Sequence, residues 1–395
     1  MKPMKVLYLI DSLQSGGAER SLAEMLPGLH ASGVEPIVAC MRRSEDGVED
    51  QVAGRFDLRF LAARRPPGRL REVRAMIRAE APAMIHTTLL ASDLLGRVAA
   101  ARTGVPVLTS LVNTSYDPVR FEDPRIRPWV FRRVQSVDGW TARRLTKHFH
   151  AITQAVKDHN VEALGIPAER VTVIERGRDA ERLGVPTLGR RAAARRLLGL
   201  DDSTEVVVTV GRQEYQKGHR FLLEAVERLS RVRPGLVLLM LGRRGAASPE
   251  IDGLLARPGM ADRVRVLGYR DDAPDVLASA DVFAFPSLFE GLGGSLIEAM
   301  ALGLPIVASD LPAIREVVEP DRNAALVPAS APDRLAAAIG ALLDDPAKRA
   351  AYAARSRAIF EERFTLERSI ERMAALYREL VAPADIANAV PASRR

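Results

Sequence analysis

The sequence of 395 residues contains one cysteine, two tryptophans and only 5% aromatic residues. Cys40 alone cannot form an internal disulfide, so nothing in the sequence requires an oxidising compartment. No apolar run approaches the ~18–20 residues that span a bilayer, and the run at 6–10 is too short for a signal peptide core. The hydrophobic fraction of 47% and the charged fraction of 27% exclude a disordered chain. We therefore expect a cytoplasmic protein of two to three domains, at about 150 residues per domain.

Positive charge is concentrated in the first half of the chain. The net charge is +7; residues 1–180 carry 27 Lys and Arg against 21 Asp and Glu, and residues 181–395 carry 30 against 29. Residues 55–147 alone carry 18 against 8. Such a basic region attracts phosphates, anionic lipid surfaces or nucleic acid. The alternative is that arginine-rich helices simply present solvated faces.

Short apolar runs alternate with helical patterns in two series, which is typical of buried strands in parallel sheets. The first series has its runs at 6–10, 37–40, 84–87, 107–111 and 171–174, and the second at 206–210, 236–241, 264–267, 282–285, 306–308 and 325–327. This pattern predicts an α/β protein with two doubly wound, Rossmann-like domains. We place them at residues 1–180 and 181–364, followed by a helix at 365–382 and a flexible tail at 383–395.

Two glycine-containing segments follow predicted strands. Gly16 and Gly17 open a helix after the first strand, where free N–H groups suit an anion, although a tight turn alone would also need glycine. The spacing is not that of the dinucleotide fingerprint. In the segment 211–218, Arg212 and Lys217 follow the first strand of the second series. These two cations can bind a diphosphate and neutralise the negative charge that develops on a leaving group. Alternatively, they are incidental cations of a solvated loop.

A third segment follows the fourth strand of the second series. The N–H groups of Gly293, Gly294 and Ser295 would lie at a helix start and suit a phosphate. Glu290 and Glu298 flank them, and ionised carboxylates accept hydrogen bonds from hydroxyls. A glycosidase-like acid/base pair is a second interpretation, and a capped helix with two surface glutamates is a third.

These segments, in this order, resemble the retaining, nucleotide-sugar-dependent glycosyltransferases of family 4. The most specific match is Glu290 and Glu298, separated by seven residues within Pro-Ser-x-x-Glu-Gly-x-Gly and before Ala-Met-Ala-x-Gly-x-Pro-Ile-Val-Ala-Ser. The segments 16–19, 211–218 and 268–286 also resemble the family. The resemblance covers roughly residues 4–380 and is strongest over 205–320. It implies the GT-B fold, in which two Rossmann-like domains face a central cleft and the last helix, here 365–382, packs back on the N-terminal domain.

The resemblance also implies roles for single residues. Arg212 and Lys217 would hold the donor diphosphate, Glu298 would bind the ribose hydroxyls and Glu290 would contact the donor sugar. Glu290, Arg212 and Lys217 are thus the candidate catalytic residues. The other donor contacts implied are Gly16, Gly17, Tyr269, Arg270, Gly293, Gly294 and Ser295.

One position departs from the family. Many relatives carry a histidine near the reacting sugar, where this chain has Asn113. An asparagine can hydrogen-bond a sugar hydroxyl but cannot carry a proton. His86, one strand earlier, is a second candidate for contact with the sugar or the acceptor, and its alternative is a buried histidine with satisfied hydrogen bonds.

The expected reaction is transfer of a sugar from a nucleotide-diphosphate-sugar donor to an acceptor hydroxyl, with retention at the anomeric carbon. The sequence contains no Asp-x-Asp triplet, so we expect no metal and no other cofactor, with Arg212 and Lys217 serving in place of a cation. The alternatives are a nucleotide-sugar epimerase, a nicotinamide dehydrogenase, whose fingerprint is missing, and a non-catalytic nucleotide-sugar-binding protein.

The acceptor is expected to be a glycan, a lipid-linked molecule or a small molecule. The segment 117–147 interleaves eight Arg and Lys residues with Trp129, Phe131 and Trp140. This composition suits an anionic membrane surface or a lipid-linked diphosphate. The alternative is a helix with arginines outside and aromatics packed inside. No nucleic-acid module is recognisable, so no nucleic acid is expected. The predicted location is cytoplasmic, with a peripheral position at the inner membrane face if the segment binds lipid.

Overall fold

The computed structural model describes residues 3–14, 16–44 and 47–382. Seven parallel strands form an N-terminal sheet in the order β3-β2-β1-β4-β5-β6-β7. The strands are β1 (Met4–Ile10), β2 (Val34–Cys40), β3 (Asp57–Phe60), β4 (Met84–Thr88), β5 (Val107–Leu111), β6 (His148–Ala151) and β7 (Val171–Val173). The helices around them are α1 (Gly17–Ala31), α2 (Glu49–Ala53), α3 (Pro66–Glu80), α4 (Leu90–Ala100), η1 (Pro118–Glu122), α5 (Pro128–Leu145), α6 (Gln154–Leu164) and η2 (Ala168–Arg170).

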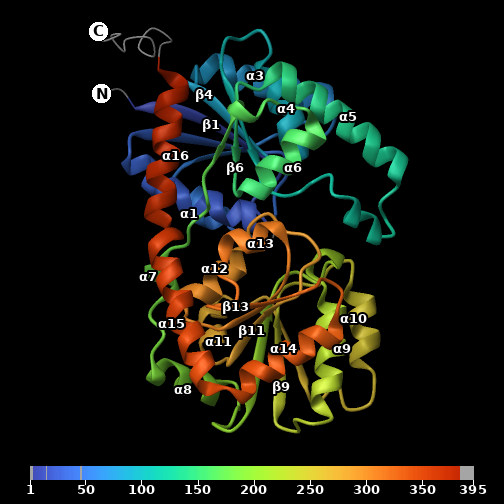
Figure 1. Cartoon of the computed structure of the whole chain (residues 1–395). Coiled ribbons are helices and arrows are strands. Elements are labelled where there is room, and N and C mark those ends of the chain that lie inside the picture. Colours follow the sequence, from blue (N-terminus) through green and yellow to red (C-terminus); the bar gives the residue numbers. More distant parts are fainter. Residues whose placement is uncertain (1–2, 15, 45–46, 383–395) are drawn as a thin grey trace, which may run out of the picture.

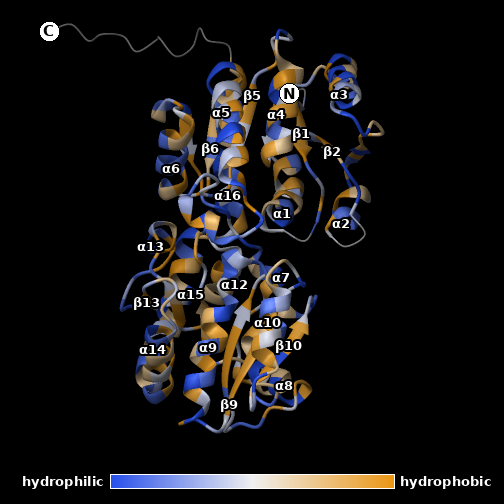
Figure 2. Ribbon diagram, turned by 90° about the vertical axis from the view of Figure 1, so that its right-hand side faces the viewer, coloured by the Kyte–Doolittle hydropathy of each residue, from blue (hydrophilic) through white to orange (hydrophobic). Residues whose placement is uncertain are grey.

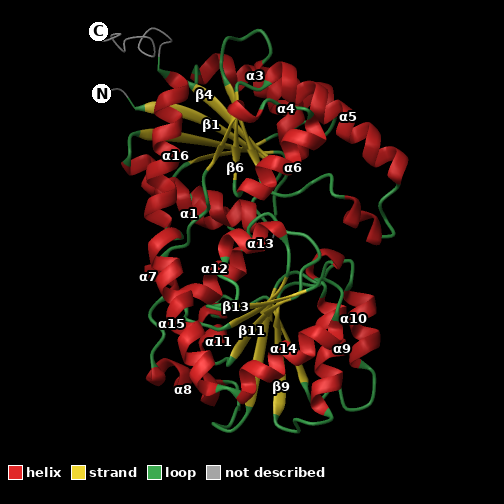
Figure 3. Ribbon diagram, in the orientation of Figure 1, coloured by secondary structure: helices red, strands yellow, loops and turns green. Residues whose placement is uncertain are grey.

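Six parallel strands form a second sheet in the order β10-β9-β8-β11-β12-β13. They are β8 (Glu205–Val210), β9 (Leu236–Leu241), β10 (Val264–Gly268), β11 (Val282–Phe285), β12 (Ile306–Ser309) and β13 (Ala324–Val327). The helices are α7 (Ala180–Leu183), α8 (Leu188–Leu197), η3 (Tyr215–Lys217), α9 (His219–Ser230), α10 (Ser248–Leu255), α11 (Ala273–Ala278), α12 (Gly294–Ala301), α13 (Pro312–Val317), α14 (Pro332–Asp344), α15 (Pro346–Arg363) and α16 (Leu366–Val381). Figures 1 and 3 show the two sheets one above the other, each between helices.

Every strand predicted from an apolar run is present, and β3 and β6 are additional. β3 is an edge strand with an exposed aspartate, and β6 contains two histidines in four residues. Both lack the continuous apolar run that identifies a buried strand. In β1, Tyr8 packs with α1 in one core cluster, whereas Leu7 and Leu9 pack with α3 in another. Helices therefore cover both faces of the N-terminal sheet, as the doubly wound prediction requires.

The strand order shows where each sheet is expected to bind a ligand. In the first sheet the order reverses between β1 and β4, and in the second between β8 and β11. Open α/β sheets bind ligands outside the carboxyl ends of the strands at this switch point. The three segments predicted to bind the donor follow β1, β8 and β11, so all of them start at a switch-point strand.

The chain passes between the two sheets twice, and the two crossings pair with each other. The N–H of Arg178 donates to the Phe364 carbonyl at 2.9 Å, and the N–H of Leu366 donates to the Arg178 carbonyl at 3.0 Å. After the second crossing, α16 lies beside α1 on the N-terminal sheet, along one side of the molecule in Figure 1. This agrees with the predicted helix at 365–382, whereas the predicted tail at 383–395 lies outside the described residues.

The hydropathy of α16 explains its position. Met373, Leu376 and Tyr377 are buried in the same cluster as Val6 and Leu26, while the opposite face of the helix is polar (Figure 2). An amphipathic helix buries its apolar stripe against the nearest uncovered apolar surface. As for membrane crossing, none of the helices in the described part of the chain is both long and apolar enough to span a bilayer.

Candidate active site

A cleft of about 260 Å³ lies where the switch-point edges of the two sheets face each other. Most of the predicted site residues line it: Gly16, Gly17, Asn113, Arg212, Lys217, Tyr269, Glu290, Gly293, Gly294, Ser295 and Glu298. Val112 and Ile152 of the N-terminal half also contribute to its wall. The hydroxyl of Thr153 donates to the Gly291 carbonyl at 2.9 Å, which holds the loop after β11 against the N-terminal half.

The loop after β8 carries the predicted diphosphate cations. It ends at Gly218, whose φ of +60° and close approach to the Pro286 carbonyl leave no room for a side chain. Lys217 reaches across to form an ion pair with the buried carboxylate of Glu290. That carboxylate also accepts a hydrogen bond from the Ser287 hydroxyl at 2.9 Å. Two candidate catalytic residues, which lie far apart in the sequence, are therefore in direct contact.

The start of α12 provides backbone donors. Gly293 caps the helix with a φ of +84° and without a side-chain hydrogen bond. The Ser295 hydroxyl does not cap it either, because it donates to the Val210 carbonyl at 3.0 Å. Since Gly293, Gly294 and Ser295 all line the cleft, the N–H groups of the first turn are placed to bind an anion.

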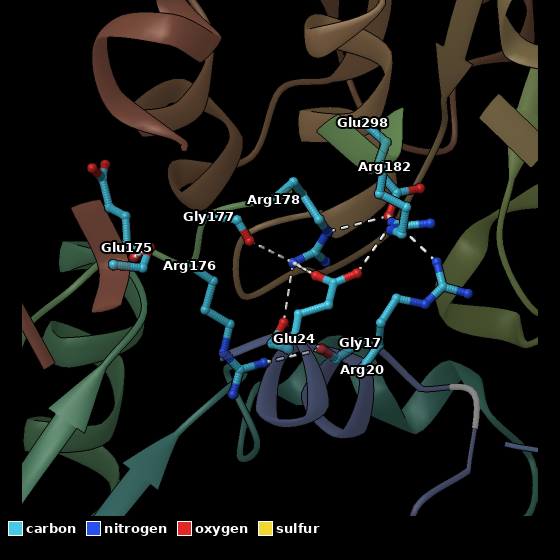
Figure 4. Close-up of polar contacts among 11 residues, drawn as sticks. Gly17, Arg20, Glu24, Glu175, Arg176, Gly177, Arg178, Arg182 and Glu298 are labelled. Carbon is cyan, nitrogen blue, oxygen red and sulfur yellow. Dashed lines mark hydrogen bonds and ion pairs between the residues drawn. The ribbon is translucent and has the colours of Figure 1, made fainter. Parts of the chain in front are cut away.

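Three arginines surround Glu298, and none of them was predicted from the sequence (Figure 4). The Oε1 atom of Glu298 lies 3.2 Å from Nε of the buried Arg178, 3.4 Å from Nη1 of Arg20 and 3.8 Å from Nη2 of Arg182. Arg178 also donates to the Ser21 hydroxyl at 3.1 Å. Glu298 thus links α12 to α1 and to the first crossing between the sheets, in addition to lining the cleft.

Further charged groups make the cleft strongly cationic. Arg176 donates to the Gly17 carbonyl at 3.4 Å, and burial together with nearby Arg178 lowers its pKa to about 10. Arg243, in the loop that follows β9, lies 4.3 Å from the centre of the Tyr269 ring. Burial raises the pKa of Glu19, which Arg212 and Arg176 partly offset. Arg176 and Arg243 could have been predicted as site residues from one feature of the sequence, which is their position shortly after a strand.

Two predicted site residues lie outside the cleft. Arg270 forms an ion pair with its neighbour Asp272 at 2.5 Å on the surface. His86 is buried: Nδ1 lies 2.7 Å from the Tyr377 hydroxyl and Nε2 lies 2.7 Å from the Ser110 hydroxyl. Burial lowers its pKa well below the ordinary value, so the ring stays neutral. The structure therefore supports the alternative of a satisfied buried histidine that ties α16 to β4 and β5.

Comparisons with known proteins agree with this geometry. The family model described as Glycosyltransferase Family 4 matches residues 15–182, and the one described as Glycosyl transferases group 1 matches residues 204–345. An alpha-D-kanosaminyltransferase of Streptomyces kanamyceticus is 28% identical over 64% of this chain and 66% of its own length. The chain thus spans about two thirds of that relative.

Two further proteins extend the comparison. A D-inositol 3-phosphate glycosyltransferase of Xylanimonas cellulosilytica is 30% identical over 75% of this chain and 72% of its own length. The structure of Anabaena Alr3699/HepE in complex with UDP-glucose superposes with a TM-score of 0.83, covering 95% of this chain and all of that chain at 24% identity. The fold and the matches together show that the chain belongs to the family 4 glycosyltransferases, with a GT-B architecture.

Proposed function

We propose that this protein transfers a sugar from a nucleotide-diphosphate-sugar to an acceptor hydroxyl with retention of anomeric configuration. The observation that carries this is the meeting of Arg212, Lys217 and the start of α12 in one cleft between the two sheets. Cations and backbone N–H groups in this arrangement suit a diphosphate. That HepE was solved with UDP-glucose makes UDP-glucose the first donor to test.

The chemistry follows from a diphosphate leaving group. The bond from the anomeric carbon to the diphosphate oxygen breaks, and its electron pair leaves with the nucleoside diphosphate. The acceptor oxygen bonds to the same face of the carbon, and its proton passes to the leaving diphosphate. Arg212 and Lys217 stabilise the charge that develops on the leaving group, so the reaction needs no divalent metal.

Both glutamates of the cleft contact the bound donor, Glu290 at the sugar and Glu298 at the ribose. When the diphosphate binds, it competes with Glu290 for Lys217, which frees the Glu290 carboxylate to accept a hydrogen bond from the donor sugar. The described contacts of Glu298 use Oε1, so Oε2 serves the ribose hydroxyls. The arginines around Glu298 hold its carboxylate in place.

A panel of nucleotide sugars tests this function through two measurements, slow donor hydrolysis and thermal stabilisation. One donor should give both, and EDTA should leave its hydrolysis unchanged. Stabilisation without hydrolysis would instead indicate a binding protein. Release of an epimerised donor would indicate an epimerase. Loss of hydrolysis in EDTA, restored by Mg²⁺, would refute the metal-free mechanism.

We also propose that α5 binds an anionic membrane surface. Trp129, Val137 and Trp140 are 59%, 52% and 54% exposed, so the two tryptophans are not packed inside as the alternative required. Spaced at intervals of three, four and eight residues, they share one helix face with Arg133. Arg132, Arg143 and Arg144 are exposed beside it. Exposed tryptophans between arginines suit the interface of an anionic bilayer.

Vesicle co-sedimentation tests the α5 proposal. The protein should sediment with phosphatidylglycerol vesicles and not with phosphatidylcholine vesicles, and high salt should weaken binding because it screens the arginines. Trp129→Ala combined with Trp140→Ala should reduce binding, while donor hydrolysis stays at the wild-type rate. Equal sedimentation of the variant and the wild type would refute the role of this face.

A further inference from the structure

Arg178 is a buried arginine that lies where the chain first crosses between the two halves, and it lines the cleft. Its backbone pairs on both sides with the second crossing, through the Phe364 carbonyl and the Leu366 N–H. The side chain therefore starts from a position that both crossings hold. A buried charge is costly unless partners pair with it, so the contacts of this guanidinium indicate what it does.

On the side of the second sheet, the guanidinium of Arg178 lies along the first turn of α12. Its Nε atom donates to Oε1 of Glu298 at 3.2 Å. Its Nη2 atom lies beside Gly294, where a Cβ atom would approach it to 2.1 Å. Gly294 and Glu298 are four residues apart and share one face of the helix. A side chain at position 294 would therefore collide with the arginine that holds Glu298.

On the side of the first sheet, the same guanidinium contacts α1 (Figure 4). Its Nη1 atom donates to the Ser21 hydroxyl at 3.1 Å and to the Gly177 carbonyl at 3.0 Å. The Ser21 hydroxyl in turn donates to the Gly17 carbonyl at 2.7 Å. A hydroxyl has one proton to donate and lone pairs that accept, so Ser21 makes both bonds at once. Arg178 is thus connected to the glycine turn at 16–17, which lines the cleft from the N-terminal half.

The contacts of Arg178 need a guanidinium. Its N–H groups point to several partners in one plane, whereas the ammonium of a lysine is a single point charge. The side chains of Arg20 and Arg182, which also contact Glu298, are 25% and 39% exposed, against 3% for Arg178. Solvent weakens exposed ion pairs, so Arg178 contributes most to fixing the Glu298 carboxylate.

We propose that Arg178 is a positioning residue that makes recognition of the donor ribose depend on the glycine turn at 16–17. The proposal rests on the transferase function and on the ribose contact of Glu298 proposed above. Arg178 holds Oε1 of Glu298 so that Oε2 faces the ribose, and Ser21 holds Arg178. The turn, these three side chains and the ribose then form one chain of hydrogen bonds between the two halves. A shift of the turn therefore changes how tightly the ribose hydroxyls are bound.

Calorimetry with UDP and with 2′-deoxy-UDP tests this role, because the two nucleotides differ in one ribose hydroxyl. The wild type should bind UDP about tenfold more tightly, which is the effect of one hydrogen bond to a charged group. Arg178→Lys keeps the charge and loses the fork, so this affinity ratio should fall to about twofold or less. Its affinity for 2′-deoxy-UDP should stay close to that of the wild type, because the diphosphate keeps its contacts. A merely structural role of Arg178 would weaken both nucleotides alike.

Ser21→Ala tests the link to the glycine turn, because it leaves the contact between Arg178 and Glu298 in place. It should lower the ratio to an intermediate value of about threefold, and it tests the proposal even if Arg178→Lys does not fold. Glu298→Gln should abolish the ratio, and Arg178→Lys added to it should change nothing further, since both act through one contact.

Arg195→Lys is the matched control. Arg195, in α8, is equally buried and donates to the Ser279 and Asp201 carbonyls, neither of which lines the cleft. This variant should keep the wild-type ratio, whatever it does to the melting temperature. If the donor panel selects a guanine nucleotide, GDP and 2′-deoxy-GDP replace the two uridine nucleotides.

A wild-type ratio in Arg178→Lys or in Ser21→Ala overturns the proposal, and so does an equal loss of affinity for both nucleotides in Arg178→Lys. Equal binding of both nucleotides by the wild type would refute the ribose contact of Glu298 and with it the role of Arg178, while donor hydrolysis could still support a transferase. A wild type that neither binds nor hydrolyses any nucleotide of the panel would refute the transferase function itself.

Discussion

Among single residues, Lys217 has two roles, because it forms an ion pair with Glu290 and is placed to bind the diphosphate. We predict that Lys217→Ala lowers turnover about 10²-fold or more, the loss typical of removing one key electrostatic group. It should also lower stability, since a largely buried carboxylate loses its cation. Initial rates of donor hydrolysis at saturating donor, together with the melting temperature, measure both effects.

Arg212→Ala is the companion variant, because Arg212 lines the same cleft. It should lose turnover to a similar extent with a smaller change in melting temperature. Rates within twofold of the wild type in either variant would remove that cation from the mechanism.

Asp93 should leave a signature in the pH dependence of stability. Burial raises its pKa from 3.8 to about 7; Arg97 and Thr87 act against this shift, and Asp138 and Asp11 add to it. The folded chain therefore keeps a proton that the unfolded chain loses between about pH 4 and 7. Wild-type stability falls across that window relative to Asp93→Asn, by up to about 4 kcal/mol. Urea unfolding of both proteins at pH 4, 6 and 8 measures this difference, and a difference that does not vary with pH would contradict the prediction.

The sequence identified site residues where one short segment carries them. Arg212 and Lys217 follow β8, and Glu290 and Glu298 bracket the start of α12, so each pair appears as a local motif. Arg178 was missed because its partners Ser21 and Glu298 are distant in sequence and meet only when the chain folds. Arg270 was included because it neighbours Tyr269, but its side chain turns to Asp272 instead.

Single elements show why some of the fold was predictable and some was not. Strands with continuous apolar runs were found, because burial on both faces demands apolar residues at every position. β3 and β6 lack this pattern and were missed. The sequence of α5 did not decide whether its aromatic residues face the core or the solvent. In the structure they divide: Phe131 faces inward toward Tyr116, while Trp129 and Trp140 face solvent. Helical periodicity alone does not distinguish a core face from an exposed apolar face.

The paired crossings between the sheets depend on Gly177. A side chain there would place its Cβ atom 2.0 Å from the Thr365 carbonyl oxygen, which is backbone and cannot move freely. We predict that Gly177→Val destabilises the protein by about 1–3 kcal/mol, as overpacking does. Gly235→Ala is the control, because that exposed glycine has open space around its Cβ position. Chemical denaturation measures both, and equal stability of the two variants would show that the crossings separate at little cost.

At the scale of the whole molecule, α16 makes the two halves depend on each other. It starts at the second crossing, buries Met373 and Leu376 against the N-terminal sheet, and brings the Tyr377 hydroxyl to His86. Removing it would expose an apolar groove beside α1 and leave two buried histidines, His86 and His150, with an opening to water. Each uncovered aliphatic side chain costs about 1.5–3 kcal/mol.

We therefore predict that truncation after Phe364 unfolds the N-terminal half first, although residues 366–381 are far from that half in the sequence. A chain truncated after Ala382 is the control and should melt as the full chain does. Hydrogen exchange should show lost protection in β1 and β4, while β8 and β11, whose core clusters do not include α16, keep theirs. Uniform loss of protection in both sheets would mean that the halves fold as one cooperative unit, and retained protection in β1 would mean that α16 covers the sheet without stabilising it.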